Sequence, residues 1–371
     1  MKLKHTSKTM EYVSRYPAMV RAMCGLLSCF IAMFTIIHLT GKTEAAGGNS
    51  FDIAVDPTRT YGDLTAVGEY SLPEGADYTI AQWSKLGNTS YFLTTDGRVY
   101  ALGATANGAA GIGEAPPRDI LRAPERVWAG EAALDGSGNW EEIGGAKYLT
   151  NIVSIAAPYA WDAAGRLYVW GINTEGCLGL NSSDTSLVAY APVRVRAHAT
   201  MGHPDDYETL PANGTFAAGT YVTNVEAMNG GQRAGYVTKG DHRFYTWGES
   251  STWYAYAAFQ GTHGYAPRPV PAGEAGDAAH GHPDDYYTVG TTKYMKNVDS
   301  YFVGSEESLV TCGGRLYACG RNRGVGGPTW PTTLSYTTGL KRLPTGANVL
   351  AADSETVGGR AVFKGVTKVM K

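Results

Sequence analysis

The side chains best suited to chemistry occur in a segment that appears twice in this sequence. Gly-His-Pro-Asp-Asp-Tyr at residues 202–207 returns at residues 281–286. Imidazoles and carboxylates at this spacing can ligate a divalent cation. Pro-Asp-Asp is equally the chemistry of a tight turn, and no third set of ligands accompanies the two copies, so we favour the turn. The candidate metal ligands are His203, Asp205, Asp206, His282, Asp284 and Asp285.

A run of aromatic residues occupies positions 251–261. Aromatic side chains are enriched at binding hot spots, so this run could form a contact surface for a protein or a sugar. The same side chains could instead pack against a neighbouring structural unit, and both interpretations stay open. The candidate partner-binding residues are Trp253, Tyr254, Tyr256 and Phe259.

Recognisable catalytic motifs are absent from the sequence. There is no nucleophile elbow, no zinc-binding helix motif, no phosphate-binding glycine loop and no convincing pair of carboxylates. We therefore expect no catalysis and no cofactor. Because some β folds assemble active sites from scattered loops, an enzyme or lectin acting on surface polysaccharide remains the alternative.

The first 45 residues have the pattern of an export signal. Five basic residues precede Ala22–Leu39, a stretch of eighteen residues without a formal charge. Cleavage after Ala45 would release the rest of the chain, whereas an apolar run of this length can also remain as an anchor. We expect residues 1–45 to be a signal peptide or signal-anchor helix, and residues 46–371 to form a secreted or cell-surface domain.

The charge of this domain argues against nucleic acid as a partner. Removing six basic and two acidic residues from totals of 31 and 34 leaves 25 basic and 32 acidic residues, a net charge near −7. Nucleic-acid-binding surfaces have the opposite sign. The expected partner is a protein on the cell surface or in the exterior medium, with membrane contact only through an uncleaved N-terminal segment.

Short strands and tight turns suit the composition, which has 48 glycines, 24 tyrosines and only 18% charged residues. Outside the signal there are three cysteines, Cys177, Cys312 and Cys319. A Gly-Gly turn after Cys312 predicts that Cys312 pairs with Arg315, which places Cys319 too far away for a disulfide. The domain must then be stabilised by its core.

A strand-like motif recurs along the chain and predicts stacked supersecondary units. Its clearest form is Gly-Arg-Leu-Tyr-Val-Trp-Gly at 165–171, and its final glycines are spaced by 68, 77, 72 and 45 residues. Leu167, Tyr168, Val169 and Trp170 are apolar on both alternating faces, as expected for a sheet covered on both sides. The other copies are 97–103, 242–248, 314–320 and 359–365.

Each copy follows an apolar stretch and a turn, which predicts a β-hairpin whose second strand is the copy itself. A Pro-x-x-Val pattern then follows in the first three units, with leucines in the fourth. The apolar stretches are Tyr91–Leu93, Ile152–Ala156, Ala234–Val237 and Leu309–Val310; the Pro-x-x-Val pairs are Pro124/Val127, Pro192/Val195 and Pro267/Val270, and the leucines are Leu340 and Leu343.

Together the recurring strand, the glycine-rich stretch 171–179 and the later Pro-x-x-Val resemble the repeat of the regulator of chromosome condensation family. The resemblance covers about residues 80–371 and is best at 139–200. It implies an all-β fold, a β-propeller that is commonly seven-bladed with a unit of roughly fifty residues. Members serve as protein-binding platforms, and exported ones include a propeller-type inhibitor of β-lactamase.

The spacing departs from this family pattern. Steps of 68 to 77 residues imply that each blade carries an insertion of roughly twenty residues, or that degenerate blades lie between the clear ones. With five recognisable repeats we expect five to seven blades. The fifth copy ends six residues before Lys371, so we expect a strand within Phe51–Leu72 to complete the last blade. The expected role is then an extracytoplasmic protein-binding scaffold or inhibitor-like module.

Overall fold

The computed structural model describes residues 79–113, 119–198, 203–230, 233–248, 264–303, 307–320, 337–343, 345 and 350–366. The expected signal at 1–45, the segment Phe51–Leu72 and the aromatic run at 251–261 lie outside these residues. Within the described part of the chain there is no α-helix, and no helix is long and apolar enough to cross a membrane.

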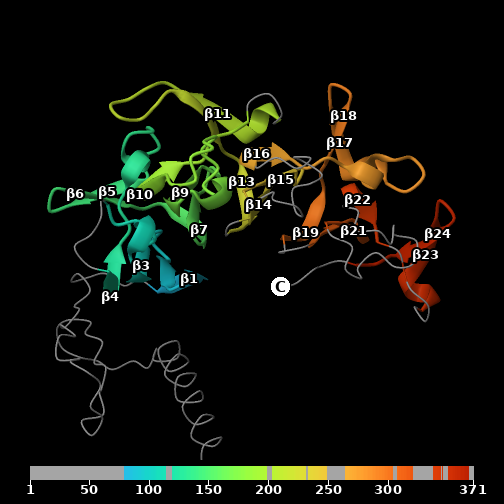
Figure 1. Ribbon diagram of the computed structural model, residues 1–371, viewed down its shortest axis with the longest axis horizontal. Coiled ribbons are helices and arrows are strands. Elements are labelled where there is room, and N and C mark those ends of the chain that lie inside the picture. The colour runs from blue at the N-terminus through green and yellow to red at the C-terminus, as the bar shows by residue number, and fades with distance from the viewer. Residues whose placement is uncertain are drawn as a thin grey trace, which may run out of the picture. The chain divides into compact units, whose positions relative to one another are not determined.

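Four antiparallel sheets, each of four consecutive strands, make up most of the described chain, and Figure 1 shows them following one another from blue to red. We call them the first to fourth blades. Their strands are β1 (Ile80–Leu86), β2 (Thr89–Thr94), β3 (Val99–Ala104) and β4 (Ile120–Arg126); β7 (Ile152–Ala156), β8 (Tyr159–Asp162), β9 (Leu167–Ile172) and β10 (Val188–Arg194); β13 (Val225–Asn229), β14 (Arg233–Thr238), β15 (Phe244–Gly248) and β16 (Gly264–Pro269); and β19 (Val298–Val303), β20 (Glu307–Cys312), β21 (Arg315–Gly320) and β22 (Thr337–Arg342).

One two-stranded hairpin follows each blade in the chain. We call these the first to fourth hairpins: β5 (Trp140–Ile143) with β6 (Ala146–Leu149), β11 (Tyr207–Leu210) with β12 (Gly219–Val222), β17 (Tyr286–Val289) with β18 (Thr292–Met295), and β23 (Ser354–Val357) with β24 (Arg360–Phe363). Short 3-10 helices connect these elements: η2 (Ala106–Gly108), η3 (Gly130–Ala133), η4 (Thr174–Gly176), η5 (Pro204–Asp206), η6 (Gly273–Gly276), η7 (Pro283–Asp285) and η8 (Ala351–Asp353).

The hairpins account for the long repeat unit. The spacing predicts an insertion in each blade or hidden degenerate blades, and the described inserts are two-stranded hairpins, not four-stranded sheets. Each hairpin is joined to its blade where the Pro-x-x-Val pattern ends, because the carbonyl of that residue accepts a hydrogen bond from the second hairpin strand. These bonds run from Leu149 to Val127, Val222 to Val195, Met295 to Val270 and Phe363 to Leu343.

The recurring motif forms the third strand of each blade, β3, β9, β15 and β21, as the sequence predicts. One expected partner was wrong. In the second blade the strand paired with β9 is β8, whereas Ile152–Ala156 is β7, one strand further away. β8 has only four residues and its apolar stretch merges with the preceding one, so sequence alone did not separate them.

The closing glycine of the motif is required by the backbone. Gly103 and Gly171 have φ values of 112° and 102°, which L side chains rarely adopt. A Cβ atom on Gly103 would lie 2.2 Å from the carbonyl oxygen of Asn88, in the turn that precedes the adjacent strand β2. Any larger residue there would force the two strands apart.

The hydrophobic core lies between consecutive blades. Tyr168 and Trp170 of β9 pack toward the first blade, whereas Leu167 and Val169 pack toward the third, and all four are 0% exposed. The expectation that both faces are covered is therefore confirmed. Full burial of such side chains contributes about 1.5–3 kcal/mol each to stability.

Tryptophans in the third strands of the second and third blades pack against the preceding blade. The indole of Trp170 packs on Gly111 and donates a hydrogen bond to the Ala109 carbonyl at 3.2 Å. Trp247 packs on Gly179 in the same way and donates to the Cys177 carbonyl at 2.8 Å. Gly111 and Gly179, which follow the motif in the first and second blades, thus leave room for the tryptophan of the next blade.

The fifth copy of the motif is not a blade strand. Residues 360–363 form β24, the second strand of the fourth hairpin, and pair with β23. The described residues therefore contain four blades, compared with the five to seven expected. The ground for expecting a partial last blade at 359–365 is thereby removed, while the expected closing strand within Phe51–Leu72 stays a prediction.

The cysteine prediction is confirmed. Cys312 pairs with Arg315 across the turn, and Cys177, Cys312 and Cys319 are all buried and form no disulfide. Burial raises the pKa of the Cys177 and Cys319 thiols to about 12, so neither forms a reactive thiolate at neutral pH.

Candidate functional site

The two His-Pro-Asp-Asp segments are the turns that begin the second and third hairpins. In η5, Pro204 occupies the first turn and the His203 imidazole accepts a hydrogen bond from the backbone N–H of Asp205. The η7 turn repeats this arrangement with His282 and Asp284. The sequence therefore folds here because proline sets the first turn and histidine caps it.

The second aspartate of each segment is buried, and its carboxylate binds side chains of the blade that follows in the chain. Asp206 is 2% exposed and receives two hydrogen bonds from the Arg243 guanidinium, at 2.7 and 2.8 Å. The Tyr245 hydroxyl donates to the same carboxylate at 2.6 Å. Asp285 is 0% exposed and binds the third-strand pair of the fourth blade, Arg315 and Tyr317, in the same way.

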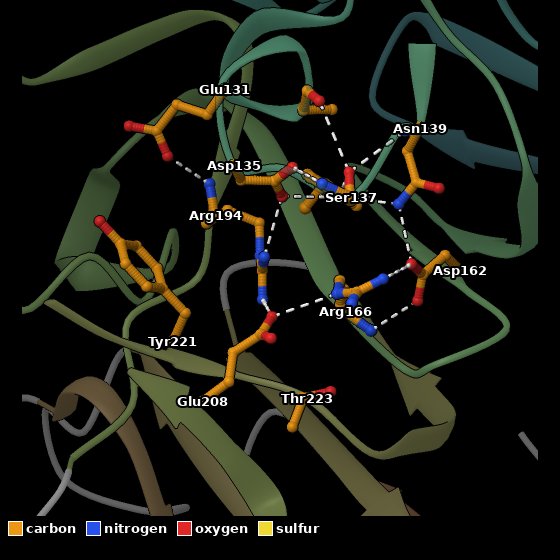
Figure 2. A network of polar contacts seen from close by, with 12 residues as sticks. Glu131, Asp135, Ser137, Asn139, Asp162, Arg166, Arg194, Glu208, Tyr221 and Thr223 are labelled. Atoms are coloured by element: carbon orange, nitrogen blue, oxygen red, sulfur yellow. Dashed lines mark hydrogen bonds and ion pairs between the residues drawn. The ribbon is translucent and has the colours of Figure 1, made fainter. Parts of the chain in front are cut away.

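The first hairpin uses a variant of this contact, shown in Figure 2. Asn139 stands where the other hairpins have aspartate, and its amide donates to the Tyr168 hydroxyl at 2.9 Å. That hydroxyl donates in turn to Asp135 at 2.8 Å, and Asp135 forms an ion pair with Arg194 at 2.9 Å. Because Asn139 is neutral, the carboxylate that binds the Tyr168 hydroxyl at this junction comes from Asp135.

A buried arginine fastens the second hairpin to its own blade. Arg194 is 0% exposed, and Figure 2 shows its guanidinium reaching toward Asp135 and Glu208. It pairs with Glu208 at 2.8 Å and lies 5.4 Å from the ring centroids of Tyr168 and Tyr221. A guanidinium that pairs with two carboxylates and lies over two rings fixes the elements that carry them in one geometry.

The first and fourth hairpins are held by the same type of pair. Arg126 binds Glu141, and Arg342 binds Glu355. Arg98 also donates to Glu141 at 2.8 Å, and this hydrogen bond holds the pKa of the Glu141 carboxyl below its ordinary value. Three of the four hairpins are therefore tied to their blades by a partly or fully buried ion pair.

The third unit has lost both members of the pair together. The register places Pro269 where the other blades have arginine, and Tyr287 where the other hairpins have glutamate. Tyr287 packs against Tyr294 with ring centroids 5.7 Å apart. Because both residues of the pair are absent, neither charge is left buried without its partner, an arrangement that would strongly destabilise the fold.

The candidate metal ligands are divided between these roles. Asp206 and Asp285 bind arginine and tyrosine, while His203 and His282 cap turns whose Asp205 and Asp284 are exposed. Among the described residues, no three His, Cys, Asp or Glu side chains gather into a group that could hold a metal ion. His203 and His282 thus act in the turns, whereas Asp206 and Asp285 act in contacts with the blade that follows.

The exposed ends of the hairpins carry apolar side chains. Ile143 precedes the turn of the first hairpin and is 51% exposed, and Val289 takes the same place in the third hairpin and is 37% exposed. Leu210 and Val357 hold the corresponding positions of the other two and are half-buried. The hairpin ends are thus the candidate contact surface among the described residues. The sequence-predicted candidates Trp253, Tyr254, Tyr256 and Phe259 lie outside those residues.

The sequence analysis did not predict the hairpins, although a recurring spacing of residues indicates three of them. Asn139 to Asn151, Asp285 to Asn297 and Asp353 to Gly365 are each twelve residues apart. These residues begin and end three of the hairpins, and Asn151 and Asn297 have positive φ. The second hairpin has a longer loop, which obscures the period.

Stacked four-stranded antiparallel sheets with cores between them define a repeat protein of the β-propeller type. Within this array, residues 164–201, which span β9 and β10, match the family described as the Regulator of chromosome condensation (RCC1) repeat. The resemblance noted in the sequence is therefore confirmed.

Three solved structures are similar to this chain at low identity. Human WBSCR16 is 15% identical, with a TM-score of 0.45, over 74% of this chain and 56% of that one. Prp20p from Saccharomyces cerevisiae, described with its binding to Gsp1p and histones, is 17% identical, with a TM-score of 0.45, over 81% and 58%. Yeast RCC1 (Prp20) bound to Kap60 is 16% identical, with a TM-score of 0.44, over 80% and 56%.

The chain thus spans somewhat more than half the length of these structures. No curated protein is significantly similar to it in sequence.

Proposed function

We propose that this chain is an extracytoplasmic protein-binding repeat protein whose hairpins are its contact elements. The observation that carries the proposal is the pairing of rigid support with exposed apolar ends. The Arg126–Glu141 ion pair holds the first hairpin to its blade, and the Asp285–Arg315 pair holds the start of the third hairpin to the blade that follows, while Ile143 and Val289 remain exposed. Pre-organised apolar contacts lose little conformational entropy on binding, which favours affinity.

The test is capture of a partner by the full chain from the exterior fraction of the source cells. Replacing Ile143 and Val289 by Asp places charges in the expected interface and should abolish capture. Val153→Asp is the matched control, because Val153 is 53% exposed but lies on the blade strand β7. Equal capture by the hairpin variant and the control would contradict the role of the hairpins.

The aromatic residues Trp253, Tyr254, Tyr256 and Phe259 are a second proposed contact element, supported by sequence alone. Truncating two hot-spot aromatics typically costs about 2 kcal/mol or more of binding, roughly thirtyfold in affinity. The double replacement Trp253→Ala with Tyr256→Ala should then prevent capture at an unchanged unfolding midpoint. A large loss of stability would instead assign these rings to the core.

Location outside the cytoplasm is also a proposal, supported by the basic segment and the uncharged stretch Ala22–Leu39. Residues 1–50 fused to a reporter that is active only outside the cytoplasm should give a signal. A reporter that stays inside would overturn this part of the proposal and leave the binding role untouched.

A further inference from the structure

The junctions between consecutive blades each bury one row of side chains from the later blade. In the second blade this row consists of Ile155, Ala160 and Tyr168, which lie opposite one another on β7, β8 and β9 and are at most 2% exposed. They pack against the first blade. The third and fourth blades have rows at the same register positions, and the buried members of these rows are Tyr236, Tyr245, Val310 and Tyr317.

The first blade carries the same row on its outer face, by which we mean the face turned away from the second blade. Trp83, Phe92 and Tyr100 lie opposite one another on β1, β2 and β3. The residues that alternate with them, such as Tyr91, pack toward the second blade. Trp83 is 59% exposed, and Ile120 on the outer face of β4 is 58% exposed. Exposed aromatic and aliphatic side chains on one sheet face mark an interaction surface.

A second row on the outer face ends in two cations. The row consists of Lys85, Ser90, Leu102 and Arg122. Arg122 belongs to this face because the preceding Leu121 pairs with Gly103 and packs toward the second blade. Lys85 and Arg122 are exposed, and the side chain of neither forms an ion pair or hydrogen bond with the residues that the structure describes.

The two charges are peculiar to the first blade. Lys85 stands two residues after Trp83, and the corresponding residues of the later blades are Ala157, Gly230 and Val303. Arg122 follows the residue paired with the closing glycine of the motif, and its counterparts are Tyr190, Tyr265 and Thr338. None of these counterparts is charged. A blade that is covered by the preceding blade therefore has no charge at either place, whereas the first blade has a cation at both.

The other end of the array does not supply a suitable cover. On the fourth blade, the face turned away from the third blade carries Leu316 and Ala318, which are at most 8% exposed and pack near Phe363 and Val366. Cations pressed against these apolar side chains would be buried without partners, which strongly destabilises a contact. The first blade of a second copy would bring two further cations, and like charges facing each other disfavour association.

We propose that the outer face of the first blade binds a segment of another protein that presents apolar side chains beside carboxylates. The apolar side chains cover Trp83 and Ile120, as a neighbouring sheet covers the equivalent row of each later blade, and the carboxylates pair with Lys85 and Arg122. This contact goes beyond the hairpin ends of the proposed function, and neither surface depends on the other.

The two kinds of contact have separate consequences. Removal of the exposed apolar side chains from water favours the bound state. The ion pairs select an acidic segment and accelerate its association, and because they lie at the surface they are screened by salt. The complex should therefore weaken as the salt concentration rises.

The test is site-specific photo-crosslinking of the full chain in the cells that produce it. A photoreactive benzoylphenylalanine placed at Trp83 keeps an aromatic ring there, and mass spectrometry identifies the peptide to which it becomes joined. The expected product contains a segment of another protein with both apolar and acidic residues. The same group placed at Val153, which is 53% exposed on β7, is the control and should not be joined to this segment.

Charge reversal tests whether the cations hold the partner. Lys85→Glu and Arg122→Glu, each combined with the photoreactive group at position 83, should each lower the yield of the product at least about tenfold. Lys364→Glu reverses an exposed charge just after the fourth hairpin and should leave the yield unchanged. An unchanged thermal unfolding midpoint confirms that each variant is folded.

Other products of the crosslinking would overturn the proposal. These are a product within the chain or between two copies of it, a lipid or nucleic-acid adduct, and a product whose yield survives both charge reversals. The absence of any product would overturn it as well. Ile143→Asp combined with Val289→Asp alters the hairpin ends and should leave the product intact, so failure of this proposal is distinguishable from failure of the proposed function.

Discussion

At the scale of single residues, the buried aspartates of the junctions dominate the energetics. Asp285 is 0% exposed and neutralises Arg315, so Asp285→Ala leaves a guanidinium without its partner. Breaking such a pair typically costs about 3–5 kcal/mol. Urea unfolding should show this loss, whereas the adjacent Asp284→Asn should change stability by less than about 0.5 kcal/mol. Similar losses for both variants would show that the charge pair is not what stabilises the junction.

Glu141 should make stability depend on pH in the acid range. The Arg98 hydrogen bond lowers its pKa below the model-compound value of 4.5, so the folded state holds this proton less tightly than the unfolded state. Its contribution is therefore fully present above pH 4.5 and is lost as pH falls through the lower folded-state pKa. Urea unfolding of Glu141→Gln should show a flatter loss of stability below pH 4.5 than the unmodified chain.

Glu142→Gln is the control for this measurement, because Glu142 is the exposed neighbour on the same strand. Its pH profile should follow that of the unmodified chain. A profile of Glu141→Gln that also follows the unmodified chain would contradict the assigned pKa shift.

The roles of single residues were only partly predictable. The repeat of His203 and Asp206 at 282 and 285 was visible, and the turn was the favoured interpretation. Burial of the second aspartate was not predictable, because its arginine partner lies 37 residues further along the chain. The equivalent Asn139 and Asp353 share no surrounding sequence with it, since only the hairpin geometry is common.

At the scale of elements, glycine–tryptophan contacts join the third strands of the second and third blades to the preceding blade. Gly179 has φ +66°, and a Cβ atom there would lie 2.8 Å from Nε1 of Trp247. Gly179→Ala should therefore destabilise the protein by about 1–3 kcal/mol. Gly136→Ala is the control, because Gly136 has φ +76° and nothing lies within 4 Å of its Cβ position. Thermal unfolding should show a larger loss of stability for Gly179→Ala than for Gly136→Ala. Equal losses would mean that only the backbone penalty at positive φ is measured and that the contact with Trp247 contributes nothing.

The strands were predictable and the hairpins were not, for a physical reason. Alternating apolar residues after a Gly-Gly turn describe any half-buried strand. The fifth motif copy at 359–365 fits this pattern because Val362 is 0% exposed, yet it belongs to a hairpin. Only the strand partners distinguish the two cases, and those are long-range contacts.

At the scale of the whole molecule, the fold class followed from composition and the repeat, whereas the number of blades did not. Blade number depends on how each sheet face packs on the next, and sequence spacing does not report this when insertions lengthen the unit. The signal expected at residues 1–45 and the closing strand expected within Phe51–Leu72 lie outside the described residues and remain predictions. In a stack of units that contact only their neighbours, the contacts between adjacent units determine which units unfold together.

Trp247 offers the sharpest test of this coupling. It is 1% exposed, packs edge-on against Tyr159 of the preceding blade at 5.6 Å, and donates to the Cys177 carbonyl. Trp247→Ala should cost about 3–5 kcal/mol by leaving a cavity in the core between the second and third blades. Because that core joins the two halves of the described array, the loss should also separate their unfolding.

Hydrogen exchange at increasing urea concentration measures the separation. In the unmodified chain, amides of β9 and β21 should exchange in one transition. In Trp247→Ala, the two strands should exchange at different urea concentrations, since β9 remains packed on the first blade through Trp170 and β21 on the third blade through Tyr317. A single transition at lower urea, common to both strands, would mean that the blades fold as one unit whose cooperativity does not pass through this contact.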